Sequence, residues 1–417
     1  MSDEAIPLIT EKLEMALLKL AMTICVLCKG LNKQMKSARP IQSIKAIKIL
    51  HLISSLDTGG AETSLFRLVT NTDKGSFNNI VVSMTGIGPV GKEIQACGIP
   101  VYALKMEKGL PDPRGVWHLY RLIHQLRPAI IQCWMYHANI LGLFALMKRH
   151  LIWNIRCSDM DLVRYGPVYR WSIKLGAFLS GYPDMIVANS HAGRITHETL
   201  GYHPKRWEVI PNGFDTDIFK PDPEARAHIR AALGIPEDSI VIGLIARLDP
   251  MKDHKNFFNA ANILLTLHAH VHFILAGRGV SMSNPVVADL MGGITKRDRF
   301  HLLGGRDDIA CVFAALDIAS SSSSYGEGFQ NTIGEAMATG VPCVVTDVGD
   351  SKVIVGDAGI VVPKKDHVAL AHGWDRLINA GLPAINKMGM AARERIVRFY
   401  TMNIVIERYQ KLYDSII

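Results

Sequence analysis

Residues 321–343 read SSSSYGEGFQNTIGEAMATGVPC, and two carboxylates in this stretch, Glu327 and Glu335, stand eight positions apart. Glu327 is flanked by glycines, which predicts a tight turn around it. Glu335 falls inside a helix that we expect to begin near Gln330 or Asn331. One acid is therefore predicted in a glycine-rich loop and the other on the helix that follows.

The flanking runs predict that this loop and helix stand at the edge of a parallel sheet. The run 312–322 is expected to be a strand that enters the turn, and 340–349 reads as the next buried strand. A strand, a glycine loop and a helix N-terminus together form a site for an anion, since the first N–H groups of a helix have no partner within it. Two acids beside an anion would repel it unless they bind hydroxyl groups. The pattern therefore points to a ligand with both phosphates and hydroxyls, which is a nucleotide sugar.

Length and composition indicate a globular protein. The chain has 417 residues, of which 48% are hydrophobic and 20% charged, and this length suits two domains of roughly 150–200 residues each. The seven cysteines are odd in number and scattered, which predicts reduced, mostly buried thiols and a cytoplasmic compartment. Cys25 and Cys28 form a CxxC pair, but no second pair or nearby histidine completes a zinc site.

The net charge of +8 belongs to the first half of the chain, because residues 211–417 contain slightly more acidic than basic residues. A basic half can face nucleic acid, a membrane surface or an anionic substrate. The sequence contains no nucleic-acid-binding motif, so we expect no nucleic-acid partner. The membrane surface and the anionic substrate remain.

Residues 1–45 precede the first predicted strand. Their apolar run, 16–28, is too short to span a bilayer, and the acids before it and the lack of a convincing cleavage site argue against a signal peptide. The alternatives are an accessory helix packed on the first domain, an amphipathic helix at a membrane surface, or an extension from a start codon placed too early. The sequence leaves the role of this segment open.

From residue 46 onward, strands alternate with helices in two successive blocks. This pattern predicts an α/β fold with two doubly wound, Rossmann-like domains that face each other across a cleft. Strands are expected at 46–53, 79–84, 101–106, 129–134, 185–190 and 207–213, and then at 239–248, 271–279, 300–304, 311–321, 341–349 and 358–363. The predicted domains are 46–208 and 209–395, with a linker at 210–222, and a helix in 396–417 is expected to pack back on the first domain.

Two further motifs suggest other kinds of site and are better explained as turns. Residues 86–91 match the GxGxxG pattern of dinucleotide-binding proteins, but they follow the second strand, and the turn after the first already contains Gly59 and Gly60. The DxD tripeptides at 159–161 and 215–217 are of a kind that holds a metal on a diphosphate in some sugar transferases. Neither ends an apolar strand, so we expect turn-forming aspartates and no bound metal.

Two basic residues complete the candidate site. Arg247 ends the predicted strand VIGLIAR, and Lys252 follows five residues later, just before a helix. Both are expected to project into the cleft, where Arg supplies a planar fork of donors and Lys a mobile charge, a clamp suited to a diphosphate leaving group. The alternative is a solvated surface pair. It is weakened because both residues come from the domain that carries the acidic pair.

These motifs resemble those of the family 4 glycosyltransferases, a retaining class with the GT-B fold. The matching segments are GGAE at 59–62, VIPNGFDTDIF at 209–219, ARLDPMKDH at 246–254, ILAGRG at 274–279 and EGFQNTIGEAMATGVP at 327–342, which is the family's E-x7-E signature. They cover 46–417 in the expected order. Residues 132–142 and 153–159 further resemble the branch that builds surface polysaccharides such as O-antigen or exopolysaccharide.

The resemblance implies catalytic and binding roles. Glu335 would bind the ribose hydroxyls of the nucleotide and Glu327 the hydroxyls of the donor sugar. Arg247 and Lys252 would stabilise the charge that develops on the diphosphate. His137, after the strand AIIQCW, would lie near the reacting carbon of the sugar; the alternative is a histidine that caps the strand or helix.

The resemblance also assigns donor contacts to loop residues whose backbone or lack of a side chain matters: Gly328, Phe329, Gln330, Asn331, Gly59 and Gly60. The two first-domain glycines would let their loop approach the phosphates without a Cβ in the way. Gln330 departs from the family pattern, since relatives often carry Pro or Gly there, and residues 1–45 have no counterpart.

The expected activity is retaining glycosyl transfer from a UDP- or GDP-sugar to a glycan or polyprenyl-diphosphate-linked acceptor, with no metal or other cofactor. The first domain would bind the acceptor and contact an anionic membrane surface from the cytoplasm. The preferred contact patch is Arg164, Arg170 and Lys174, interleaved with Tyr165, Tyr169 and Trp171. Two alternatives are a nucleotide-sugar epimerase or hydrolase of the same architecture and a catalytically weak partner in a polysaccharide assembly.

Overall fold

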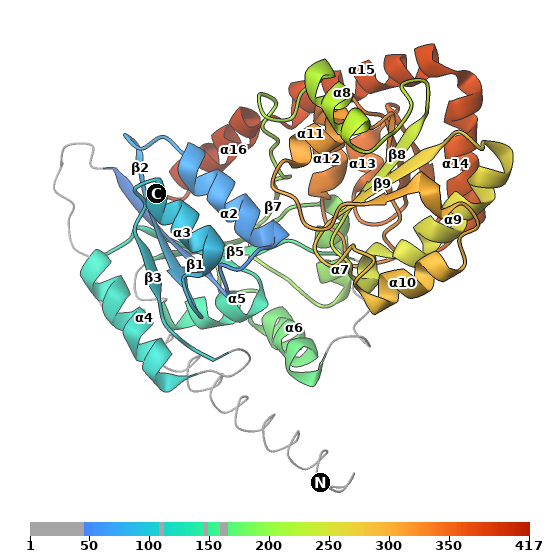
Figure 1. The fold of residues 1–417 in the computed structure, drawn as a ribbon. Helices are drawn as coiled ribbons and strands as arrows, with labels where there is room; N and C mark the ends of the chain where they lie inside the picture. The colour runs from blue at the N-terminus through green and yellow to red at the C-terminus, as the bar shows by residue number, and fades with distance from the viewer. Residues whose placement is uncertain (1–45, 108–111, 146–148, 159–165) are drawn as a thin grey trace, which may run out of the picture.

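The computed structural model describes residues 46–107, 112–145, 149–158 and 166–417, which form two α/β domains (Figure 1). Each domain is built on a parallel sheet, one of 7 strands and one of 6, with helices on both faces. The fold class predicted from the sequence is confirmed. Residues 1–45, the tripeptide 159–161, and Arg164 and Tyr165 lie outside the described residues.

The first sheet has the strand order β3-β2-β1-β4-β5-β6-β7. Its strands are β1 (Ile47–Ile53), β2 (Phe77–Ser83), β3 (Val101–Ala103), β4 (Ile130–Trp134), β5 (His150–Ile155), β6 (Met185–Ala188) and β7 (Trp207–Val209). The helices between them are α2 (Gly60–Asn71), α3 (Gly88–Ala96), α4 (Pro113–Leu126), α5 (Tyr136–Gly142), the 3-10 turn η1 (Leu143–Ala145), α6 (Pro167–Leu179) and α7 (His191–Thr199).

The second sheet has the order β10-β9-β8-β11-β12-β13. Its strands are β8 (Val241–Ile245), β9 (His272–Ala276), β10 (Phe300–Leu302), β11 (Ile318–Ser321), β12 (Cys343–Thr346) and β13 (Gly359–Val362). The helices are α8 (Pro223–Ala232), η3 (Pro250–Lys252), α9 (His254–Leu267), α10 (Pro285–Gly292), η4 (Arg297–Arg299), α11 (Ile309–Ala314), α12 (Asn331–Ala338), α13 (Ser351–Val355), α14 (His367–Ala380), α15 (Leu382–Phe399) and α16 (Met402–Asp414).

Both sheets are buried on both faces, which explains why their strands read as uninterrupted apolar runs. All five residues of β8, VIGLI, are buried, and so are all five of β9, HFILA. Four clusters of buried side chains cover the faces, two for each sheet. Each domain therefore has its own core, and the sheets' carboxyl edges remain available for a site.

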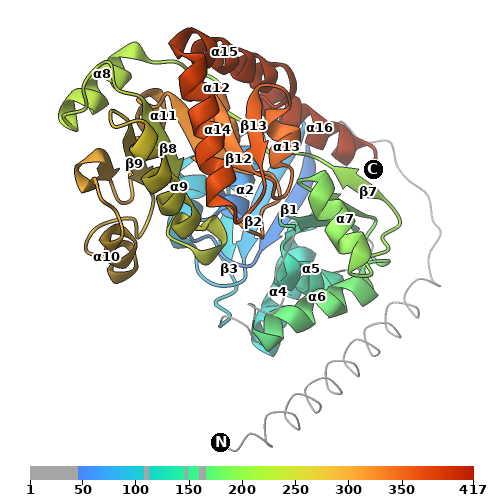
Figure 2. The same cartoon turned by 90° about the vertical axis from the view of Figure 1, so that its right-hand side faces the viewer.

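The last helix, α16, returns to the first domain, as the sequence predicted (Figure 2). Its apolar side chains belong to the same cluster as Ile49 of β1 and Leu65 of α2. Phe214 in the linker and Thr401 before α16 form a parallel β-bridge, so the two chain segments that cross between the domains run together. The Tyr413 hydroxyl donates to Oε1 of Gln132 in β4 over 2.5 Å, which fixes the far end of the helix.

The prediction of secondary structure was wrong at two places. The strand β5 was not expected, yet it lies inside the first sheet between β4 and β6. The run 311–321 was expected to be one strand, whereas Ile309–Ala314 form α11 and the strand begins only at Ile318. The alanine-rich part of that run favours a helix, and the β-branched and serine residues after it enter the sheet.

Candidate functional site

The two strand orders place the candidate site. In each sheet the order reverses beside its first strand, between β1 and β4 and between β8 and β11. Loops that follow neighbouring parallel strands diverge at such a reversal and leave a crevice for a ligand at the carboxyl edge. The GGAE loop follows β1, and Arg247 and the Glu327 loop follow β8 and β11. The sequence motifs therefore meet at the reversal points of both sheets.

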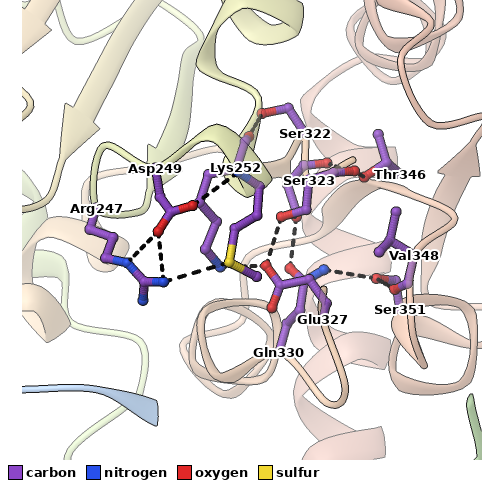
Figure 3. Close-up of polar contacts among 12 residues, drawn as sticks. Arg247, Asp249, Lys252, Ser322, Ser323, Glu327, Gln330, Thr346, Val348 and Ser351 are labelled. Atoms are coloured by element: carbon purple, nitrogen blue, oxygen red, sulfur yellow. Dashed lines mark hydrogen bonds and ion pairs between the residues drawn. The ribbon is translucent and has the colours of Figure 1, made fainter. Parts of the chain in front are cut away.

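Glu327 is held as a buried carboxylate (Figure 3). Its Oε1 lies 2.5 Å from Nζ of Lys252 and accepts a hydrogen bond from the Ser323 hydroxyl over 2.8 Å. The residue is only 8% exposed. A Cβ on Gly349, whose φ is +61°, would collide with the carbonyl oxygen of Glu327, so that position needs a glycine. A charged pair with so little water around it supplies a fixed field for a ligand.

Lys252 comes from the short turn η3, which Asp249 caps by accepting from the Met251 N–H. Arg247 donates two hydrogen bonds to Oδ2 of the same Asp249 carboxylate, from Nε over 3.0 Å and from Nη2 over 2.9 Å (Figure 3). Burial raises the pKa of Asp249, but the Met251 N–H and the Arg247 guanidinium outweigh it and hold that pKa below its ordinary value. The Arg247 side chain remains 43% exposed. The two basic residues thus share one loop, yet only Lys252 bonds to Glu327.

Glu335 is the fifth of the eight residues of α12 and is 8% exposed. Its Oε1 lies 2.8 Å from Nη2 of Arg67, a residue of α2 in the first domain. Sequence analysis did not identify Arg67. It stands two helical turns beyond the glycines of the GGAE motif, so the motif placed its helix but gave no sign of its partner.

The loop between the two acids is fastened to its surroundings by the side chains of Phe329 and Gln330. The Phe329 ring is 4% exposed and packs on Phe214 of the linker. The Gln330 amide accepts from the Ser321 hydroxyl over 2.7 Å and donates to Ser351 over 3.1 Å (Figure 3). Both side chains are engaged inside the fold. The start of α12 adds backbone N–H groups, which a helix N-terminus offers to an anionic ligand.

Asn212 of the linker ties the same loop to the first half of the chain. Its amide donates to the carbonyl of Phe329 and to Oδ1 of Asn331, both over 2.7 Å. The Asn212 oxygen accepts from Arg156, which also donates to the Ser64 hydroxyl over 2.7 Å. The start of α12 is thus connected to α2 through a continuous set of polar side chains.

The first domain contributes two glycines and a histidine. A Cβ on Gly59 would collide with the Glu62 carboxyl, while one on Gly60 would meet nothing within 4 Å, so the start of α2 is open on that side. His137 is the second residue of α5, whose N-cap Met135 has a φ of +71° that marks a strained turn after β4. Burial lowers the pKa of His137. Its Nε2 is buried and has no hydrogen-bond partner among the described residues.

Two more contacts join the domains around the Glu327 loop. The Ser158 hydroxyl, just after β5, donates to the carbonyl oxygen of Glu327. The Asp350 carboxylate accepts from the backbone N–H groups of His191 and Ala192 at the start of α7, over 2.7 and 2.8 Å. The carboxylate therefore caps a helix of the opposite domain. Asp350 follows the predicted strand 340–349, and that position at a carboxyl edge was the one signal that could have found it.

The described residues contain no group of three or more His, Cys, Asp or Glu side chains arranged to hold a metal ion. Asp215 accepts from the backbone N–H groups of Asp217 and Ile218, both over 3.0 Å, as a turn-forming aspartate does. None of the described helices is both long enough and apolar enough to cross a membrane.

Comparison with known proteins agrees with this arrangement. Residues 58–218 match the description "Glycosyltransferase Family 4", and residues 239–380 match "Glycosyl transferases group 1". Together with the two parallel sheets and their strand orders, these matches define a glycosyltransferase of the GT-B fold. The chain belongs to family 4 of these enzymes, with a group 1 domain as its second half.

Two relatives are distant in sequence but cover about three quarters of the chain. EpsF of Bacillus subtilis is 24% identical over 75% of this chain and 82% of its own length. The UDP-Gal:alpha-D-GlcNAc-diphosphoundecaprenol alpha-1,3-galactosyltransferase of Escherichia coli is 23% identical over 74% of this chain and 81% of its own. Among solved structures, HepE of Anabaena in complex with UDP superposes with a TM-score of 0.78 at 21% identity, covering 88% of this chain and 100% of HepE.

Proposed function

We propose that this glycosyltransferase moves a sugar from a UDP- or GDP-sugar to a glycan or polyprenyl-diphosphate-linked acceptor, with retention of configuration and without a metal ion. The observation that carries the proposal is the buried pair of Glu327 and Lys252, 2.5 Å apart, on loops at the reversal point of the second sheet. A carboxylate there accepts from sugar hydroxyls, and the ammonium group beside it attracts a phosphate.

Each role follows from the chemistry of the residue. Lys252 and the half-exposed Arg247 oppose the negative charge that grows on the departing diphosphate, which takes the place of a divalent cation. Glu327 orients the sugar, and Glu335 accepts from the ribose. The neutral His137 donates or accepts a hydrogen bond near the reacting carbon without adding charge.

Retention requires that the new bond form on the face from which the diphosphate leaves. We propose front-face substitution, in which the acceptor hydroxyl attacks the sugar carbon, the bond to the diphosphate breaks, and a diphosphate oxygen takes the hydroxyl proton. The carboxylate of Glu327 is already engaged by Lys252 and Ser323, which favours a sugar-positioning role over a nucleophilic one.

The names of the relatives support the substrate class. The Escherichia coli enzyme is named for UDP-Gal as donor and for GlcNAc-diphosphoundecaprenol as acceptor, and HepE has been crystallised with UDP and with UDP-glucose. A lipid-linked acceptor also fits the basic first half of the chain, because polyprenyl diphosphates are anionic and reside at membranes.

A membrane contact is proposed for the outer face of α6. Arg170, Lys174 and Phe178 are exposed and follow one another at intervals of four residues, and Phe178 is 73% exposed. Tyr169 and Trp171, expected in the same patch, instead pack against the first-domain core. Replacing both basic residues by Glu is expected to reduce flotation with anionic vesicles at low salt, whereas Arg376→Glu in the second domain leaves flotation unchanged. Equal flotation of all three proteins contradicts this contact.

The activity test is a screen of UDP- and GDP-sugars by differential scanning fluorimetry, followed by incubation of each stabilising donor with and without a polyprenyl-diphosphate-linked acceptor. The proposal is supported if transfer requires the acceptor and continues in the presence of EDTA. The NMR spectrum of the product should also show the same anomeric configuration at the transferred sugar as in the donor. Hydrolysis or isomerisation of the donor at a rate that does not depend on the acceptor would instead identify a hydrolase or an epimerase of the same architecture.

A further inference from the structure

The ion pair between Arg67 and Glu335 joins the two domains at the residue proposed to bind the nucleotide. Nη2 of Arg67 lies 2.8 Å from Oε1 of Glu335, and the two side chains are 17% and 10% exposed. Nη1 of the same guanidinium donates to the carbonyl of Gly213 in the linker over 3.4 Å. Arg67 is thus fixed at both ends of its fork, to the second domain and to the chain that connects the domains.

The pair leaves half of the carboxylate free. Arg67 bonds to Oε1 of Glu335, and none of the hydrogen bonds among the described residues goes to Oε2. An ionised carboxylate accepts at about four lone-pair positions on its two oxygens. A ribose hydroxyl can therefore donate to Oε2 while the guanidinium remains on Oε1.

Energetics favour this shared arrangement over displacement. Separating a largely buried ion pair leaves two uncompensated charges, and that costs more than one hydroxyl-to-carboxylate hydrogen bond returns. A nucleotide that had to expel Arg67 from Glu335 would lose more than it gained at this contact. A nucleotide that uses the free oxygen adds to an ion pair that already exists.

Resting on the proposed function, we propose that Arg67 is a positioning residue of the nucleotide site: it holds the Glu335 carboxylate in place and oriented for the ribose of a nucleoside diphosphate. The carboxylate that binds the nucleotide then also draws the two domains together. Donor binding and the closed arrangement of the domains favour each other as a result, because both depend on one side chain.

The test is a double-mutant cycle on nucleotide affinity, measured by calorimetry with UDP and with GDP on the full chain. Arg67→Ala is expected to weaken binding by about 10- to 100-fold, and Glu335→Gln to weaken it similarly. Combining the two substitutions should add little to either alone, because contacting residues are coupled. Arg67→Lys, which keeps the charge, should recover part of the affinity. Arg206→Ala, which removes an arginine from an exposed ion pair with Glu208, is the matched control and should bind as the unmodified chain does.

Each outcome decides the matter. Tighter binding by Arg67→Ala would mean that the arginine competes with the nucleotide, and unchanged binding would mean that the pair only joins the domains; either result overturns the inference. Additive effects on affinity in the double variant would overturn it as well, because they would mean that Arg67 and Glu335 act on nucleotide binding independently of each other. If Arg67→Ala fails to fold, Arg67→Lys and Arg67→Gln are compared in the same cycle. An unmodified chain that binds neither nucleotide refutes the proposed function itself.

Discussion

Replacing Lys252 by methionine removes the charge from the pair with Glu327 and keeps most of the side-chain volume. The two side chains are 15% and 10% exposed, so Glu327 becomes a carboxylate with little water and only the Ser323 hydroxyl as partner. Breaking a buried pair in this way costs roughly 3–5 kcal/mol. For a domain of this size each kcal/mol lowers Tm by about 2–4 °C, so a fall of about 6–20 °C is expected.

Catalysis should suffer separately from stability. Losing one preorganised charge at the diphosphate lowers turnover by at least ~10²-fold. The double variant Lys252→Met/Glu327→Gln leaves no unpaired charge, so its Tm should recover most of the loss while its turnover stays low. Lys255→Met, at an exposed position of the following helix, is the matched control for both measurements.

Calorimetry and donor-consumption assays on the same preparations distinguish the two effects. A Lys252→Met protein with unchanged Tm and unchanged turnover would refute the ion pair as described. A double variant that regained turnover along with Tm would show that the pair only supports the fold and takes no part in the reaction.

Three other predictions concern the surroundings of the site. Burial lowers the pKa of His51 from its ordinary 6.5 to about 4. Its contribution to stability is therefore complete above pH 6.5 and is lost as the pH falls toward 4, by up to about 3 kcal/mol. Between these pH values Tm should fall more steeply in the unmodified chain than in His51→Gln, and equal slopes would contradict the prediction. Gly349→Ala should lower Tm and turnover together, because its Cβ would strike the carbonyl of Glu327 at a positive φ; a variant equal to the unmodified chain in both would show that the loop adapts. Tyr413→Phe leaves the Gln132 oxygen without its buried donor and should cost about 1–3 kcal/mol in denaturant unfolding, with donor affinity unchanged; no loss would mean that the bond contributes nothing net.

The fold was largely predictable because strands buried on both faces form apolar runs that glycine loops separate. One exception, β5, shows the limit of that signal. Its Asn154 is fully buried, and its amide donates to the hydroxyl of Tyr409 in α16 over 3.1 Å. A polar residue in a buried strand is acceptable only because a helix about 250 positions away satisfies it. The residues around Asn154 in the sequence do not indicate that such a partner exists.

The residues of the candidate site likewise fall into those that the sequence identified and those that it did not. Residues whose neighbours in the sequence define a loop and a helix, such as Glu327 and Lys252, could be found from the motif alone. Arg67 and Ser158 could not, because each acquires its partner only when the domains dock. Their spacing from that partner in the sequence is arbitrary, and nothing in their immediate neighbours distinguishes them from ordinary surface residues. Asp350 also acquires its partner only on docking, and its place after a predicted strand was its one signal.

The return of α16 to the first domain has a consequence for biosynthesis. The buried residues of α16, from Met402 to Tyr413, complete the face of the first sheet that also contains Ile49 and Leu65. Domains generally fold in order as they emerge from the ribosome, but the first domain lacks part of its core until α16 has been released. Of the two domains, the first is synthesised earlier, yet its core is completed later. Truncation of α16, or a bulky group attached to it, would destabilise the domain that was translated hundreds of codons earlier.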